Sequence, residues 1–308
     1  MCIRDSRGTI ILENVSLAGE RGIPCIDIGK KCNVNLQITG ENELRTGGIR
    51  VPDSSVLTVV GDGNLTINLN SGKYFGIGNS LDEYHGELNF YQDGGIIINA
   101  NGMKGIGIGS GLGGVINIKR GHYEFDMKGQ EGACIGSVNG DSELFIEYCD
   151  MDIYSGISNG TIIGSVNGDA DIKLENISAK LQGAGNIITG IGTIAGNSCI
   201  VRLENVNISS NIRAKECYGI GCRAGRTNIY IGYAAVKSVV QGKAAVAFGN
   251  SVMSAKLYCS NADIGTNAVT EFNSDIGALE KNIQLENGRA EFILNGQEIK
   301  RQILAARL

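Results

Sequence analysis

The segment 133–141, ACIGSVNGD, returns in the next stretch of chain as 161–169, TIIGSVNGD. From Gly109 onward, a glycine preceded by a buried-type residue recurs at steps of 27, 28, 28, 29 and 28 residues. A period of roughly 20–50 residues is the signature of a solenoid, in which each repeat buries its apolar face only against its neighbours. The recurrence therefore predicts one elongated repeat domain, with coil-marker glycines at Gly29, Gly78, Gly109, Gly136, Gly164, Gly192, Gly221 and Gly249.

Within one repeat, apolar and polar residues alternate on both sides of a two-residue interruption. The pattern is clearest in 174–177 (LENI) and 203–206 (LENV). Alternation predicts short strands, because successive side chains point to opposite faces of a sheet. The interruption predicts a corner at Asn176 and Asn205, since Asn tolerates the left-handed backbone of a tight corner. With a third strand before each marker glycine, we predict an all-β, single-stranded parallel β-helix with three short strands per coil, about 28 residues per coil and eight or nine coils.

The repeat is predicted to span residues 7–266. Arg50 stands where the period predicts a glycine, and the Gly78 coil carries a loop over 79–86. Residues 267–308 are predicted to form a C-terminal cap or the start of a further module. In that segment we expect a hairpin around Asn287-Gly288, a turn at Asn295-Gly296 and a helical ending over 298–308. Residues 1–6, MCIRDS, are predicted to be a non-native leader, so that any signal peptide is missing from this chain.

Composition narrows the class of protein. The 308 residues include 46 Gly and 2 Pro and carry a formal net charge of -5. Nucleic-acid binding is disfavoured, because it normally needs a basic patch. Membrane insertion is not expected, since no apolar stretch reaches roughly 18 residues. A phosphate loop at 105–111 is disfavoured too, because no helix follows whose N-terminus could hold the phosphate. We expect a monomer.

The cysteines are interpreted as small buried hydrophobes, because several stand where other repeats have Ile, Leu or Val. Their spacing does not match a zinc site. One disulfide, between Cys217 and Cys222, remains as an alternative. The nine cysteines are Cys2, Cys25, Cys32, Cys134, Cys149, Cys199, Cys217, Cys222 and Cys259.

Four glycine-rich segments carry a resemblance to a known class of protein: 26–29 (IDIG), 48–52 (GIRVP), 61–67 (GDGNLTI) and 105–111 (GIGIGSG). They resemble the β-helix repeats of secreted and surface proteins from Gram-positive, clostridial-type bacteria, described as adhesin-like or carbohydrate-binding domain proteins. The similarity covers 8–266. It implies a right-handed parallel β-helix, an extracellular or cell-surface location and, in some members, binding of plant cell-wall polysaccharide with calcium. In the later coils, Ser, Thr, Cys or Asn follows the marker glycine, where the family pattern has further glycines.

A pectin-degrading enzyme is the catalytic alternative, because such enzymes share this pectin lyase-like fold. A hydrolase of that type needs paired carboxylates. Its family pattern is N-x-D, D-D, G-H-G and R-x-K, in that order. Here Arg213-Ala214-Lys215 comes before Asn261-Ala262-Asp263, and the chain contains neither D-D nor G-H-G.

A lyase would instead need calcium-binding aspartates beside a basic side chain. The available candidates are Asp141, Asp169 and Asp171, with Arg120 or Arg202 as the base. We interpret the two histidines, His85 and His122, as surface or turn residues, and we assign no catalytic residue.

The outward residues next to the corner provide the candidate site. Stacked coils would place three glutamates in a ladder with a step of about 5 Å. Clustered carboxylates suit a hard cation such as calcium, and exposed aromatic rings stack on sugars. The alternative is a solvated ridge, with Asn176 and Asn205 forming a structural ladder of amides. The candidate binding residues are Glu147, Tyr148, Glu175, Glu204 and Tyr233.

The expected function is therefore a non-enzymatic extracellular module for adhesion or polysaccharide binding, with calcium assistance as an option. The runner-up is a structural stalk or spacer of a surface protein, and a polysaccharide-degrading enzyme is the third alternative. A binding module would retain polysaccharide in isolation, whereas a stalk would bind nothing.

Overall fold

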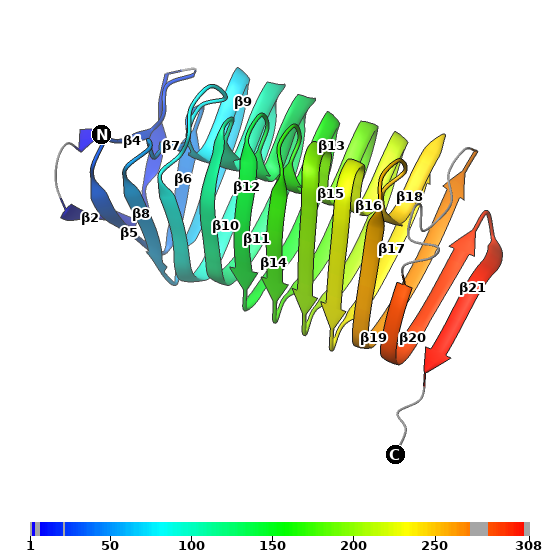
Figure 1. Cartoon of the computed structure of the whole chain (residues 1–308). Helices are drawn as coiled ribbons and strands as arrows, with labels where there is room; N and C mark the ends of the chain where they lie inside the picture. The colour runs from blue at the N-terminus through cyan, green and yellow to red at the C-terminus, as the bar shows by residue number, and fades with distance from the viewer. Residues whose placement is uncertain (1, 4–6, 21, 272–282, 305–308) are drawn as a thin grey trace.

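The computed structural model describes residues 2–3, 7–20, 22–271 and 283–304. All regular structure in these residues is β, and the strands stack by parallel pairing into a rod of about ten turns (Figure 1). Each turn takes about 28 residues. The predicted fold class is confirmed, and the rod is slightly longer than the eight or nine coils that we expected.

The strands are long in the middle of the chain because they continue around the corners of the rod. In chain order they are β1 (Cys2–Ile3), β2 (Arg7–Glu13), β3 (Ser16–Ala18), β4 (Ile26–Ile28), β5 (Asn33–Thr39), β6 (Glu41–Arg45), β7 (Ile49–Arg50), β8 (Val56–Gly61), β9 (Asn64–Gly78), β10 (Glu87–Ser110), β11 (Gly113–Ser137), β12 (Asp141–Glu147), β13 (Cys149–Ser165), β14 (Ala170–Glu175), β15 (Ser178–Glu204), β16 (Asn207–Gly232), β17 (Ala235–Gly242), β18 (Ala244–Gly249), β19 (Ala255–Thr270), β20 (Ile283–Leu294) and β21 (Gln297–Leu304).

Each coil contributes to three flat walls, which we call faces A, B and C. In one representative coil, face A is β12, face B is the first part of β13 (149–157) and face C is its last part (159–165). The inward side chains of all three faces meet in a single apolar column that extends from Ile10 to Phe292. The predicted three strands per coil are therefore present, although the backbone joins some of them without a break.

The marker glycines pair from coil to coil in one column at the end of face C. Gly78 pairs with Gly109, and the pairing continues to Gly249. Arg50 pairs with Gly78, as predicted, but the residue below it is Asp27 rather than Gly29. Arg50 and Asp27 form an ion pair of 2.6 Å there. Gly29 therefore lies two residues outside the column.

The corner between faces A and B is a row of residues with left-handed backbone. Asn176, Asn205, Tyr148 and Tyr233 have φ of 53°, 50°, 52° and 46°. The amide Nδ2 of Asn205 donates to Oδ1 of Asn176 at 2.5 Å. The predicted left-handed corners at Asn176 and Asn205 are therefore confirmed. In addition, the side-chain amide of Asn205 links two successive coils.

The C-terminal segment differs from the prediction in two places. The hairpin expected at Asn287-Gly288 is wrong, because β20 stays parallel to β19 through this point and Asn287, with φ of 49°, makes one more corner. The turn at Asn295-Gly296 is confirmed and leads into β21, which pairs antiparallel with β20. The helical ending is wrong as far as Leu304, because this segment takes up hydrogen bonds along β20; residues 305–308 lie outside the described part.

The parallel pairing therefore continues beyond residue 266, to Leu294. Within the segment predicted to be a leader, β1 pairs parallel with β4.

The cysteines follow the interpretation as core residues. Cys217 lies opposite Ala245 in the strand pairing of face C, before the marker glycine Gly221. Cys222 follows Gly221, and both cysteines are free, buried thiols. Five extended residues span about 16 Å, which exceeds the reach of a disulfide. The alternative disulfide is therefore wrong. The buried cysteines are Cys25, Cys32, Cys134, Cys149, Cys199, Cys217, Cys222 and Cys259.

Candidate functional site

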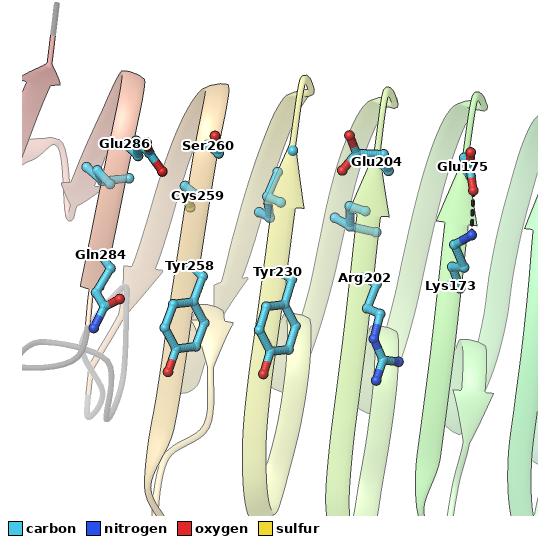
Figure 2. A pocket seen from close by; sticks show the side chains of 14 residues that line it. Lys173, Glu175, Arg202, Glu204, Tyr230, Tyr258, Cys259, Ser260, Gln284 and Glu286 are labelled. Atoms are coloured by element: carbon cyan, nitrogen blue, oxygen red, sulfur yellow. Dashed lines mark ion pairs between the residues drawn. The ribbon is translucent and has the colours of Figure 1, made fainter. Parts of the chain in front are cut away.

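Face A carries two rows of outward side chains near the C-terminal end of the rod (Figure 2). Coil-to-coil pairing aligns each row, and the rows lie two residues apart on every strand. The row beside the corner, which we call the glutamate row, is Glu147, Glu175, Glu204, Gly232, Ser260 and Glu286. The second row, which we call the tyrosine row, is Lys173, Arg202, Tyr230, Tyr258 and Gln284.

The two rows line an open groove of about 790 Å³ on face A, which we call the face A groove. Its walls come from β14, β15, β16, β19 and β20, so the groove runs across five successive coils. A ligand that lies along the rod would therefore meet a new pair of side chains on each coil.

Two stacked tyrosines form the centre of the tyrosine row. The ring centroids of Tyr230 and Tyr258 are 5.0 Å apart, and the ring planes differ by 7°. Tyr230 is 41% exposed, and Tyr258 is half-buried. Figure 2 shows both hydroxyl groups pointing away from the glutamate row. The guanidinium carbon of Arg202 lies 6.0 Å from the centroid of the Tyr230 ring, within reach of a cation–π contact.

The cationic side chains of the groove are neutralised by carboxylates of the same face. Lys173 Nζ lies 2.5 Å from Glu175 Oε2, and Arg202 pairs with Asp171. The hydrogen bond that Lys173 donates to Glu175 raises the pKa of Lys173 above its ordinary value, and the charges of Glu147 and Glu204 add to the effect. Both cations are consequently held against the protein surface.

The glutamate ladder exists, but it is not a bare set of carboxylates. Glu147, Glu175 and Glu204 pair in register on successive coils. Lys119 forms an ion pair with Glu147, and Lys173 forms one with Glu175, which relieves the repulsion between like charges. Among the described residues, no group of three or more His, Cys, Asp and Glu side chains is placed to hold a metal ion. Two of the three glutamates of the ladder, Glu147 and Glu175, are therefore neutralised by ion pairs.

The two predicted tyrosines lie at the corner and outside the face A groove. Tyr148 and Tyr233 are 62% and 64% exposed, and Asn176 and Asn205 separate them along the corner row. Three coil steps of about 4.8 Å place them roughly 14 Å apart. Of the five predicted binding residues, Glu175 and Glu204 line the groove, while Glu147, Tyr148 and Tyr233 do not.

Sequence reasoning missed the tyrosine row. Tyr230 and Tyr258 occupy the same outward position of consecutive coils, two residues before the glutamate row. A search for aromatic residues that recur at the coil period would have found this pair.

The residues considered for a lyase are partly brought together, because Asp141, Asp169 and Asp171 line one open pocket of about 760 Å³. Arg202 lies beside Asp171, but Arg120 pairs with Asp93 at 3.0 Å. On face B, Asp263 lies six residues, or roughly 20 Å, along the strand direction from the position of Arg213. The two candidate hydrolase motifs are therefore not brought together.

The histidines differ in environment. His122 is exposed, as expected, whereas the ring of His85 is buried against the backbone of Gly114. Burial lowers the pKa of His85 to about 4, against a smaller opposite effect of the Gly86 carbonyl at 2.5 Å from Nδ1. Of the expected surface or turn position, only the turn is correct for His85: it lies in the loop between β9 and β10, but this loop folds over the start of the next coil and buries the ring.

The described residues contain no helix with the length and apolarity that a membrane span requires. No protein-family model, curated protein or solved structure matches this chain.

Proposed function

We propose that this β-helix is a non-enzymatic carbohydrate-binding module and that its face A groove holds an extended polysaccharide. The observation that carries the proposal is the Tyr230–Tyr258 stack in the floor of an open groove of about 790 Å³. Aromatic rings present a large apolar face together with a polar hydroxyl. This combination suits a sugar ring, whose C–H face is apolar and whose rim is polar.

The coil spacing supports a ligand that runs along the rod. Neighbouring strands lie about 4.8 Å apart, which is comparable to the length of one sugar residue in an extended chain. Polar side chains flank the tyrosines on both sides, with Arg202 before them and Gln284 after them in the same row. Successive sugar residues would thus meet aromatic faces in the centre of the groove and hydrogen-bonding groups at its ends.

An adhesive or polysaccharide-binding role outside the cell is part of the same proposal. It is supported by the likeness of the glycine-rich coils to clostridial-type surface proteins. Calcium has no necessary part in it, because Lys119 and Lys173 already neutralise two glutamates of the ladder.

The test replaces the tyrosine stack. A glycan array identifies the polysaccharide, and affinity electrophoresis or calorimetry then compares the wild type with Tyr230→Ala, Tyr258→Ala and the double variant. We expect each single change to weaken binding about 10-fold, or about 1.4 kcal/mol, with the circular dichroism spectrum unchanged. Tyr233→Ala, an exposed tyrosine outside the groove, is the matched control.

Equal binding by the wild type and the double variant would remove the tyrosine stack from the proposal. Repeating the titration with EDTA tests calcium separately, and we expect no change in affinity.

A structural stalk remains the second candidate, because one apolar column extends from Ile10 to Phe292 and makes the rod continuous. A protein that retains no glycan on the array and in affinity electrophoresis, while folding normally, would favour the stalk.

A further inference from the structure

The charges of the face A groove are unequally compensated. Both of its cations are already engaged, because Lys173 pairs with Glu175 and Arg202 pairs with Asp171. Two carboxylates of the glutamate row, Glu204 and Glu286, form no close ion pair within the part of the chain that the structure describes, and Glu204 interacts with Lys173 only at longer range. Among the described residues, the groove therefore has more carboxylates than cations beside the tyrosine stack.

These two carboxylates stand at either end of a gap in the glutamate row. Gly232 and Ser260 occupy the two intervening coils, and neither has a side chain large enough to fill the space. A Cβ atom on Gly232 would lie 2.2 Å from Oε2 of Glu204, so this carboxylate extends over Gly232. Figure 2 shows the carboxylates of Glu204 and Glu286 directed toward the gap from opposite sides.

The tyrosine stack lies directly beside the gap. Tyr230 precedes Gly232 by two residues, and Tyr258 precedes Ser260 by two, so rings and gap occupy the same two coils. A sugar ring stacked on the tyrosines would project a substituent into the space between the carboxylates.

From this arrangement we infer that the ligand of the face A groove is a saccharide bearing free amino groups, an inference that rests on the proposed carbohydrate-binding function. An ammonium group in the gap would donate charge-assisted hydrogen bonds to Glu204 or Glu286, which are stronger than bonds between neutral groups. The tyrosine faces would add cation–π attraction. An anionic saccharide would meet these two carboxylates, and the net charge of -5 would repel it at longer range.

The test uses three oligosaccharides of equal length: β-1,4-linked glucosamine, its fully N-acetylated counterpart and α-1,4-linked galacturonate. Calorimetry at low salt and at a pH where the amines are charged gives the three affinities. We expect the glucosamine oligomer to bind at least 10-fold more tightly than the acetylated one, and galacturonate to show no binding. Raising the salt concentration should reduce only the preference for the amine.

Variants locate the effect. Glu204→Gln combined with Glu286→Gln should abolish the preference for the amine and leave weak binding of the acetylated oligomer. Glu143→Gln, which removes a carboxylate from face A outside the groove lining, is the matched control and should leave the preference intact. Thermal melting checks that each variant is folded.

The possible results separate the two proposals. Equal affinity for the amine and acetylated oligomers, or tighter binding of galacturonate, overturns the amine inference and leaves carbohydrate binding standing. A preference that survives in the double glutamine variant overturns the assignment to Glu204 and Glu286. No binding of these oligomers, together with no glycan retained on an array, overturns the proposed function as well.

Discussion

At a marker glycine, the backbone of one coil passes so close to the next that no side chain fits. A Cβ atom on Gly164 would lie 1.9 Å from the carbonyl oxygen of Gly192, and Gly164 has φ of 133°. Gly164→Ala would combine backbone strain with overpacking, so we expect a loss of about 3 kcal/mol in the free energy of unfolding. Urea denaturation measures it.

Gly265→Ala is the control for that substitution. Gly265 lies in β19 with ordinary backbone, and no atom lies within 4 Å of its added Cβ. This variant should be neutral or slightly more stable than the wild type. Equal losses at Gly164 and Gly265 would contradict the close-approach explanation.

The buried His85 predicts a specific acid sensitivity. Its pKa is about 4 in the folded protein against an ordinary 6.5, so folding favours the neutral ring. The stabilising contribution is complete above pH 6.5 and is lost as the pH falls from 6.5 toward 4. Between pH 7 and pH 4, the wild type should lose about 3 kcal/mol more than His85→Gln.

Urea titrations of both proteins at the two pH values measure this difference, since carboxylates that titrate in the same range contribute equally to both. Parallel losses in the wild type and His85→Gln would show that the ring is not held neutral.

Some of these residues are readable from the sequence and others are not. Glycine and asparagine favour left-handed backbone conformations, so their positions in the sequence already predict the marker column and the corners at Asn176 and Asn205. The stack of Tyr230 on Tyr258 depends on which outward positions face each other across coils. The burial of His85 depends on a loop that folds over Gly114. Neither fact is a property of the local segment.

At the scale of the element, the last coil shows why local signals mislead. Asn287-Gly288 has the composition of a hairpin turn, yet β20 continues through it as a further corner. The corner is favoured because parallel pairing with β19 satisfies the backbone of β20 on both sides of Asn287. Likewise, β21 forms where composition favours a helix, because the other edge of β20 offers unpaired backbone groups.

The pairing of β21 predicts an effect of truncation. Deleting residues 297–308 would expose the edge of β20, and an exposed edge strand pairs with other chains. We expect the truncated protein to self-associate more strongly than the full chain at the same concentration, measured by light scattering after size exclusion. Deleting only 305–308 leaves β21 in place and is the control. A monomeric 297–308 deletion would show that β21 is dispensable as an edge cover.

The whole molecule behaves as a stack of near-equivalent units. Gly136 and Gly164 occupy the same position of consecutive coils, as do Ser137 and Ser165. Deleting residues 137–164 therefore removes one complete coil and joins Gly136 to Ser165 in register. Because repeats contact mainly their neighbours, we expect a folded, shorter rod whose melting temperature falls by a few degrees and whose face A groove, which other coils build, is intact.

Deleting 137–150, half a coil, would shift every later side chain out of register, and we expect it to abolish cooperative melting. Comparable behaviour of the two deletions would contradict the independence of the coils.

Because equivalent positions pair along the rod, two coordinates are enough to specify where each outward residue lies. Its place within the coil fixes the angle around the axis, and the number of its coil fixes the height, as in cylindrical coordinates. Phe145 and Lys173 share the angle of Tyr230 and Tyr258 at two lower heights. An aromatic platform is thus a movable feature of this surface, and a change of two side chains would reposition it without touching the core that supports it.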